Sequence, residues 1–435
     1  MKKIADQIVH FTKFTPGGQT LGELIDGRKI FAWGVLPGET AKIRVTKNKK
    51  SYAEGFAIDV IKTAPNRIEA RDNCYLATSP WQILNWNDEL HIKEQLTRES
   101  FAQAKIDLNI APIATDNHEF GYRNKMEYAL YFMSLAEAQQ PNNESFLATF
   151  SDADLTRNYI DHDAQVTGGK VFLAFHQRGS HRKIPILHSS IERPEIFRRA
   201  QQMIDELNTR GEDAWKYQSL MVRASQNGEV SAVLFVNRQP HPIMKNLVDT
   251  ILGHVYSYSP NGFFQINLPV YELALREIAQ QLDASKNVVD MYSGVGTIGL
   301  SVAADRNLTL VETDDHAFAE LQKNIVDDTC HSVRAMHAKA EEALEYITND
   351  STLILDPPRA GLDAAVCQKI RAAKPRIVIY LSCSPTTQAR DVARILGNDE
   401  TQFSEKSDYQ ITFARPFNFF PRTPHIENLI VLQIK

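Results

Sequence analysis

One cysteine, Cys383, lies where a thiol could react with a ligand. It follows a β-branched hydrophobic run at residues 377–381 and precedes a polar turn that begins at Ser384. Such a run is typical of a buried strand, and in an open α/β sheet ligands bind outside the carboxyl ends of the strands. The pattern therefore predicts a nucleophile that is presented to a substrate.

A glycine-rich loop lies upstream of this cysteine. Gly294, Gly296 and Gly299 follow a predicted strand at residues 287–290 and precede a helical pattern. Without Cβ atoms the backbone can turn tightly and approach a ligand. Glu312, at the end of the next predicted strand, could accept hydrogen bonds from ribose hydroxyls. These features predict a nucleoside cofactor and leave NAD and S-adenosylmethionine open as alternatives.

The tetrapeptide Asp356-Pro357-Pro358-Arg359 follows another predicted strand. Its two prolines fix the backbone and donate no hydrogen bonds, so they form a rigid ledge that presents Asp356. A carboxylate held in this way can accept hydrogen bonds from the edge of a planar base. A dehydrogenase has no obvious use for this ledge, so it favours an enzyme that acts beside a nucleobase.

A thiol in such a site could activate a pyrimidine. Addition of the Cys383 thiolate to C6 of uracil makes C5 nucleophilic enough to attack a methylsulfonium carbon. The thiol must first be deprotonated, which requires an electropositive or hydrogen-bonding setting. A base must then remove the C5 proton, and Glu427, just before the hydrophobic run at 429–432, is the candidate. We assign no catalytic role to His425.

The surrounding elements predict an α/β fold class with three parts. Residues 266–435 alternate strands with helices, which predicts a doubly wound, mostly parallel, Rossmann-like methyltransferase domain. Residues 1–65 predict an OB-like β-barrel. Residues 66–265 predict a central α+β domain, with a helical segment near 84–115 that packs on the catalytic domain. The predicted C-terminal elements are strands at 287–290, 308–311, 353–355, 377–381 and 429–432 and helices at 317–325 and 364–373.

The bulk properties are those of an ordinary globular protein. The chain has 435 residues, 43% hydrophobic and 23% charged, with a net charge of −5, so any nucleic acid must bind to local basic patches. Candidates are residues 47–52, where cations adjoin a tyrosine, and the basic stretch 178–183. No apolar run is long enough to span a membrane, so we expect a cytoplasmic protein. The sequence leaves the oligomeric state open, and a monomer is the default expectation. The cysteines, which form no CxxC pair and so indicate neither zinc nor disulfides, are Cys74, Cys330, Cys367 and Cys383.

Nearly the whole chain resembles the RNA uracil-5-methyltransferases with an N-terminal TRAM domain, among them the 23S ribosomal RNA 5-methyluridine enzymes and their transfer-RNA relatives. The resemblance rests on several motifs in the order found in that family. They lie at residues 121–126, 261–267, 290–299, 356–361, 382–385 and 420–427.

The resemblance implies roles for individual residues. Cys383 matches the nucleophile of the family and Glu427 its proton-abstracting base. The barrel matches the RNA-binding TRAM module, and the cofactor is S-adenosylmethionine. The residues that match cofactor-pocket positions are Gln265, Tyr292, Thr297, Glu312, Lys339 and Asp356.

Two departures from the family pattern stand out. Many relatives hold an iron–sulfur cluster on four cysteines, but here only Cys74 remains in the corresponding stretch, and residues 186–189 contain no cysteine. We therefore expect no cluster, with Trp81 and neighbouring apolar residues filling the space. Ser384 replaces the usual asparagine after the nucleophile, and its small hydrogen-bonding side chain should preserve activity.

The leading hypothesis is methylation of uridine C5 in structured RNA, with 23S ribosomal RNA as the first candidate and transfer RNA as the alternative. A second hypothesis is methylation of another RNA base or uridine context. A third is a non-catalytic RNA-binding or folding factor, against which Cys383, Asp356 and Glu427 argue together. An NAD dehydrogenase is the most distant hypothesis. The sequence does not identify the RNA or the uridine.

Overall fold

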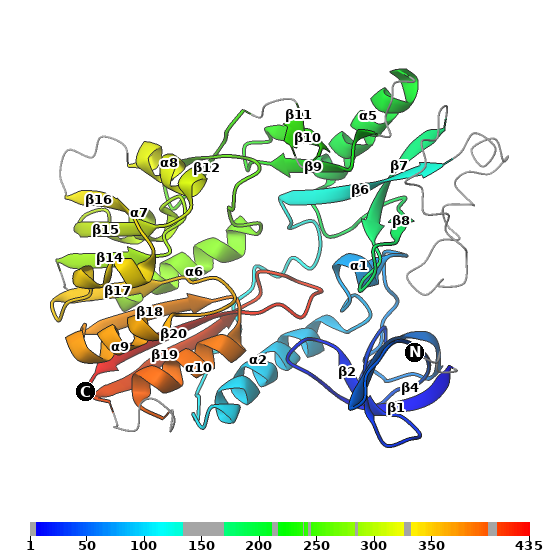
Figure 1. Cartoon of the computed structure of the whole chain (residues 1–435), viewed down its shortest axis with the longest axis horizontal. Coiled ribbons are helices and arrows are strands. Elements are labelled where there is room, and N and C mark those ends of the chain that lie inside the picture. The colour runs from blue at the N-terminus through cyan, green and yellow to red at the C-terminus, as the bar shows by residue number, and fades with distance from the viewer. Residues whose placement is uncertain are drawn as a thin grey trace.

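The computed structural model describes residues 6–133, 169–210, 216–237, 239–241, 245–282, 286–325, 332–398 and 407–435. Cys330 lies outside these ranges. Three bodies are visible in Figure 1: an N-terminal barrel, a central sheet and a C-terminal sheet flanked by helices. Among the described residues, no helix is both long and apolar enough to cross a membrane.

The N-terminal body is a closed five-stranded barrel in the order β1-β2-β3-β5-β4. Its strands alternate buried and exposed positions, as half-buried strands do, and Phe11, Ile30 and Ile43 are fully buried inside it. Gly55 is required where β4 and β5 approach, because an added Cβ would lie 2.5 Å from the Arg44 carbonyl oxygen. The strands are β1 Gln7–Phe14, β2 Thr20–Glu23, β3 Lys29–Trp33, β4 Thr40–Asn48 and β5 Tyr52–Lys62.

A short helix α1 (Tyr75–Thr78) and a long helix α2 (Trp86–Gln103) follow the barrel. Helix α2 lies between the barrel and the C-terminal body, against α10 (Pro385–Leu396) (Figure 1). It is shorter than the helical segment expected near 84–115. Lys105 has a φ of 59°, and the chain then runs extended beside β19 (Tyr409–Phe417).

The central sheet has six strands in the order β11-β10-β9-β6-β7-β8, all paired antiparallel. Helix α5 (Pro194–Arg210) packs its apolar stripe on this sheet. A separate hairpin, β12 and β13, precedes the expected boundary at 266 but packs into the core of the C-terminal body. The strands are β6 Lys125–Met133, β7 Lys170–His176, β8 Lys183–Pro185, β9 Ser219–Ala224, β10 Val230–Val236, β11 Gln239–His241, β12 Leu247–Ile251 and β13 His254–Tyr258.

The C-terminal sheet has seven strands in the order β16-β15-β14-β17-β18-β20-β19, parallel except where β20 runs antiparallel to both neighbours. Successive residues of one strand, such as Val288 and Val289, enter different hydrophobic clusters on the two faces. Helices therefore cover both faces, and the predicted fold class is confirmed. The strands are β14 Asn287–Met291, β15 Asn307–Glu312, β16 Val333–His337, β17 Ser351–Leu355, β18 Ile377–Ser382 and β20 Glu427–Ile434. The remaining helices are α6 Leu268–Gln281, α7 Thr297–Ala303, α8 Asp315–Asn324, η2 Ala340–Glu342, η3 Leu344–Tyr346 and α9 Ala364–Ala373.

Candidate active site

Three reactive side chains meet where the parallel strands of the C-terminal sheet end, a side of the sheet that we call the sheet edge. Asp356 follows β17 and Cys383 follows β18, so both lie at the carboxyl ends of parallel strands. Glu427 begins β20, which runs the opposite way, so the start of β20 lies at the same edge. The pairing of Ser382 with Asn428 places Cys383 and Glu427 beside each other.

Charge and burial keep the Cys383 thiol protonated in the free protein. Burial first, and then the nearby Glu427 and Asp356 carboxyls, raise the pKa of the thiol to about 11. Arg359 opposes this through its positive charge and a hydrogen bond to the thiol, both of which lower the pKa. Arg359 is thus the described cation that favours the thiolate.

The two carboxyl groups are also shifted toward their neutral forms. Burial raises the pKa of Asp356 to about 7. Burial raises the pKa of Glu427 well above its ordinary value, the Asp356 charge adds to this, and Arg359 partly offsets it. Two carboxyl groups that disfavour each other's charge can hold and transfer a proton near neutral pH.

His425 faces the same edge, although sequence reasoning gave it no role. Its Nδ1 accepts a hydrogen bond from Arg359 Nη2 at 3.3 Å. Burial first, and then the charges of Arg359 and other nearby cations, lower the pKa of His425 to about 4. The ring is therefore neutral and able to accept this bond, so His425 helps to fix the guanidinium beside the thiol.

The glycine loop between β14 and α7 has the expected backbone geometry. Tyr292, Gly294 and Gly296 have φ values of 63°, 57° and 88°, so the backbone turns sharply before α7. A Cβ added to Gly299 would lie 2.8 Å from Asp290 Oδ2, which shows why this position needs glycine. A Cβ added to Gly294 would meet no atom within 4 Å, so a ligand could approach the backbone at this residue.

Glu312 holds this loop in place. Its Oε2 accepts the Gly294 N–H at 2.8 Å, and its Oε1 accepts the N–H groups of Thr313 at 2.8 Å and Asp314 at 2.7 Å. Each carboxylate oxygen has two lone pairs, so the side chain retains capacity for a ribose hydroxyl. Glu312 thus lies beside the glycine loop, as expected for a cofactor-pocket residue.

The other expected pocket residues come from different elements. Thr297 begins α7, and its hydroxyl lies 2.7 Å from the hydroxyl of Tyr271. Tyr292 is half-buried against the core, and burial raises the pKa of its hydroxyl. Lys339 follows Ala338, whose N–H donates to the backbone carbonyl of Glu312 at 3.1 Å. The Lys339 side chain is exposed, however, and its Nζ lies 3.9 Å from the Glu342 carboxylate. No described contact joins Lys339 to the other pocket residues.

Gln265 is placed by a set of contacts that the sequence did not reveal. Arg223, which is fully buried, donates hydrogen bonds to the carbonyls of Gly262 at 3.0 Å and Phe264 at 2.7 Å. Asn124 Nδ2 donates to the Gln265 carbonyl at 3.0 Å. The central sheet therefore fixes the backbone of residues 260–266, and this backbone presents Gln265.

The stretch that corresponds to the iron–sulfur site does not fit such a cluster. Asp72 Oδ2 accepts hydrogen bonds from Gln82 Nε2 at 2.8 Å and Ser190 Oγ at 2.8 Å, and Asp72 Oδ1 lies 3.3 Å from His188 Nε2. Cys74 is the one thiol of this stretch, whereas protein-bound clusters are held by several thiolates. Within the described ranges, no group of three or more His, Cys, Asp or Glu side chains could hold a metal ion.

Trp81 does not lie in that stretch's polar network but at the barrel. Its ring packs on Phe14 with centroids 5.0 Å apart, and its Nε1 donates to the Gly18 carbonyl at 3.0 Å. Trp81 thus joins this stretch to the barrel, and its expected filling of the space of a cluster stays a prediction.

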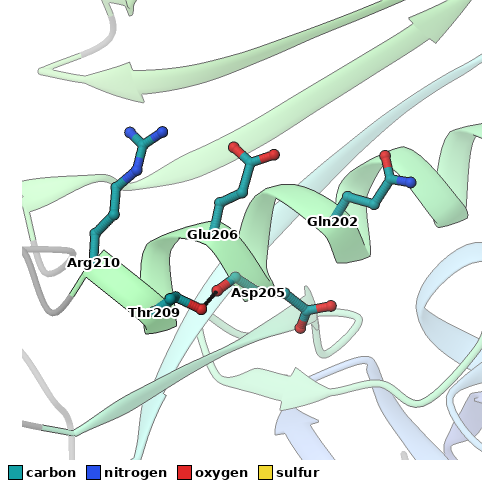
Figure 2. Close-up of a pocket in the computed structure, with 5 residues that line it drawn as sticks. All are labelled: Gln202, Asp205, Glu206, Thr209 and Arg210. Atoms are coloured by element: carbon teal, nitrogen blue, oxygen red, sulfur yellow. Dashed lines mark hydrogen bonds between the residues drawn. The ribbon is translucent and has the colours of Figure 1, made fainter.

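Figure 2 shows a surface hollow on α5, far along the chain from these motifs. Its lining side chains all come from about two and a half turns of the same helix, and Thr209 Oγ1 donates to the carbonyl of Asp205 within that helix. This is a solvated helix face, and it shares no element with the site at the sheet edge.

Comparison with known proteins finds relatives among methyltransferases that act on RNA. The sequence model of the family described as tRNA (uracil-5-)-methyltransferase matches residues 249–435. The predicted resemblance to the RNA uracil-5-methyltransferases is confirmed. An uncharacterised RNA methyltransferase of Gloeobacter violaceus is 24% identical over 463 residues, covering 98% of this chain and 96% of that protein. Another from Halalkalibacterium halodurans is 26% identical, covering 94% and 93%.

A solved structure shows the same fold. The chain matches Pyrococcus abyssi tRNA (uracil-54, C5)-methyltransferase, determined in complex with S-adenosyl-L-homocysteine, with a TM-score of 0.67 and 20% identity. The match covers 98% of this chain and 99% of that one. These two chains therefore share their fold along almost their whole length.

Proposed function

We propose that this protein transfers a methyl group from S-adenosylmethionine to C5 of a uridine in structured RNA. The observation that carries the proposal is the convergence of Cys383, Asp356 and Glu427 at the sheet edge next to the glycine loop. Ribosomal RNA is the first candidate substrate and transfer RNA the second. The protein acts as a cytoplasmic monomer in this proposal.

The cofactor pocket has the features that a nucleoside ligand needs. Asp290 Oδ1 is buried without a hydrogen-bond partner among the described residues, and Gly294 has open space where a Cβ would be. When bound, S-adenosylmethionine supplies an electrophilic methyl group on a sulfonium. The residues proposed to hold it are Gln265, Tyr292, Thr297, Glu312 and Asp356, with Lys339 at the exposed rim.

The side chains at the edge can then perform covalent catalysis. The Cys383 thiolate adds to C6 of uracil, and the ring electrons pass to C5 and O4. C5 would take the methyl group of the sulfonium, whose carbon–sulfur electron pair would stay on the departing S-adenosylhomocysteine. Glu427 then removes the C5 proton, the C5–H electron pair forms the C5–C6 double bond, and the C6–S bond breaks with its electron pair returning to the Cys383 sulfur. Arg359 stabilises the thiolate at the start and end of this cycle.

RNA binding is supported by aromatic and cationic groups around the edge. Phe263 is 76% exposed although it directly precedes the buried Phe264. The Arg178 guanidinium, from the basic stretch of the central body, lies 4.5 Å from the Trp33 ring centroid of the barrel. Such pairs suit a backbone phosphate and a stacked base. We propose that the barrel is a TRAM-type RNA-binding module, in a chain divided at 1–65, 66–265 and 266–435.

The tip of the barrel contributes less than residues 47–52 suggested. Lys47 forms an ion pair with Glu54 at 2.7 Å and lies 5.7 Å from the Tyr52 ring centroid. Lys49 and Lys50 are exposed, so they are the cations of this tip that remain for phosphate contact.

The test uses tritiated methyl-S-adenosylmethionine with ribosomal and transfer RNA pools from cells that lack the gene. We expect label in 5-methyluridine of one pool, and we expect Cys383→Ala to abolish both label and covalent RNA adduct while RNA binding persists. Cys367→Ala, which alters a thiol in the hydrophobic core, is the matched control and should keep activity. Methylation by Cys383→Ala would refute the covalent mechanism, and absence of label from both pools with the wild-type protein would refute the proposed reaction.

A further inference from the structure

The loop between β19 and β20, residues 418–426, is buried although it has no regular structure. Asn418 is 0% exposed, Phe419 1% and Arg422 1%. This β19–β20 loop reaches to the middle of the molecule in Figure 1 and leads directly into Glu427. The loop therefore sets, together with the pairing of β20 to β18 and β19, where the Glu427 carboxyl lies.

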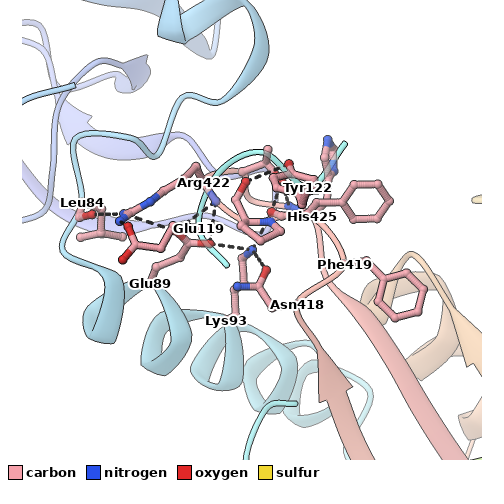
Figure 3. Close-up of polar contacts among 12 residues, drawn as sticks. Leu84, Glu89, Lys93, Glu119, Tyr122, Asn418, Phe419, Arg422 and His425 are labelled. Carbon is pink, nitrogen blue, oxygen red and sulfur yellow. Dashed lines mark hydrogen bonds and ion pairs between the residues drawn. The ribbon is translucent and has the colours of Figure 1, made fainter. Parts of the chain in front are cut away.

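Arg422 anchors the loop to α2 and to the segment before the central sheet (Figure 3). Its backbone has a φ of 63°, and its N–H donates to the Glu89 carboxylate at 2.9 and 3.1 Å. The guanidinium donates to the Leu84 carbonyl at 2.5 Å and pairs with Glu119. One residue thus fixes the loop through its backbone and its side chain at once.

Lys93 completes this anchor from the next turn of α2. It is fully buried, pairs with Glu89 at 2.9 Å, and donates to Asn418 Oδ1 at 2.6 Å and the Phe420 carbonyl at 3.0 Å. Two cations therefore face two carboxylates, Glu89 and Glu119, which balances the buried charge. The loop is held at its first, third and fifth residues by side chains of one helix and one neighbouring segment.

The other two bodies also touch the loop. Tyr122 OH donates to the Pro421 carbonyl at 3.0 Å, and the backbone N–H of Trp81 donates to the Arg422 carbonyl at 3.0 Å. In the barrel, a Cβ added to Gly18 would lie 2.2 Å from Cβ of Pro424. The barrel, α2 and the approach to the central sheet all meet at this loop.

Buried ion pairs are a poor means of raising stability, because desolvation offsets their attraction, but they fix geometry. We propose that Arg422 is a positioning residue that sets the Glu427 carboxyl for removal of the C5 proton. This inference rests on the proposed methylation reaction. The role of Arg422 concerns one step of that reaction, the removal of the C5 proton after the methyl group has been transferred.

The step has a defined balance. After C5 has taken the methyl group, the pyrimidine carries a C6–S bond to Cys383 and one hydrogen on C5. Glu427 takes that proton, the C5–H electron pair forms the C5–C6 double bond, and the C6–S pair leaves with sulfur. If Glu427 is displaced, the methylated adduct forms but is released slowly.

The experiment compares Arg422→Met with wild type and with Arg98→Met, which alters an exposed arginine of α2 that pairs with Glu94. Rapid-quench samples on a denaturing gel give the rates at which the RNA–protein adduct appears and disappears. We expect adduct release to slow on the order of tenfold or more, as for a displaced catalytic group, with a much smaller change in adduct formation. Arg98→Met should match wild type in both rates.

Glu119→Gln is the second variant, because removing Arg422 leaves the buried Glu89 and the partly exposed Glu119 with one cation, Lys93, and could prevent folding. Glu119 is 33% exposed at its side chain, so its loss is easier to accommodate, and the same selective slowing of release is expected. Equal slowing of formation and release, or no change in release, in a folded variant would overturn the inference. Failure of wild type to label RNA would instead refute the proposed function, so the two failures are distinguishable.

Discussion

Asp290 provides a test of how burial controls charge beneath the glycine loop. Its side chain is fully buried, Oδ2 accepts the Gly299 N–H at 2.8 Å, and Oδ1 has no partner among the described residues. Burial raises the pKa of Asp290 from 3.8 to about 8, the bond from Gly299 opposes the rise, and the Asp356 and Glu312 charges add to it.

The sign of the effect on stability follows from this rise. The folded protein keeps a proton that the unfolded chain releases above pH 3.8, so the contribution is full below about pH 4 and is lost as the pH rises to about 8. A rise of about four pK units, at about 1.4 kcal/mol each, sets an upper limit on the order of 5 kcal/mol.

The perturbation is Asp290→Asn, which keeps an acceptor for Gly299 but cannot ionise. The free energy of unfolding is measured by urea titration at a series of pH values between 5 and 8. It should fall as the pH rises, and the fall should be smaller in Asp290→Asn than in wild type by several kcal/mol. Asp305→Asn, at an aspartate whose side chain is 76% exposed, should keep the wild-type dependence. Parallel wild-type and Asp290→Asn curves across this range would refute the reasoning.

Three further predictions concern the loops around the edge. Gly18→Val should lower the Tm and slow adduct release, because the new side chain meets Pro424 and Gly18 has a φ of 84°; unchanged values of both would contradict the packing. Phe263→Ala should raise the KM for RNA about tenfold, the value of one lost stacking contact, with Tm unchanged, since the ring is 76% exposed. Asn124→Ala should weaken binding of S-adenosylhomocysteine several-fold in calorimetry by freeing the Gln265 carbonyl; unaltered affinity would exclude that link.

Much of the site could be predicted because its residues lie at strand ends. The hydrophobic run before Cys383 and the run after Glu427 identify buried strands, and a doubly wound sheet brings such ends together. The strands that the prediction lacked, β16 and β19, are the two outermost strands of the sheet. Edge strands are less buried and mix polar residues such as Arg415 into their pattern, so period-two alternation is weak there.

The anchoring residues could not be predicted for a different reason. Arg422 meets Glu89, a residue of an earlier body, and Arg223 meets carbonyls of a loop after the central sheet. Neither contact has a local signature, because an arginine is ordinarily exposed, whether in a loop as Arg422 is or in a strand as Arg223 is. Lys339 shows the converse, since its place in the chain suits the pocket while its side chain is exposed toward Glu342.

The electrostatics of Cys383 lead to a final prediction about the order of events. In the free protein, burial and two nearby carboxyls hold the thiol pKa at about 11, with Arg359 as the opposing cation. A bound sulfonium adds a positive charge to the proposed pocket, which lowers the pKa of a nearby thiol, whereas the sulfur of S-adenosylhomocysteine is neutral. Alkylation of Cys383 by iodoacetamide at pH 8, followed by mass spectrometry, should therefore be slow in the free protein and faster with S-adenosylmethionine than with S-adenosylhomocysteine. Equal rates with the two saturating ligands would show that cofactor charge does not activate the thiol, and activation would then have to come from the RNA.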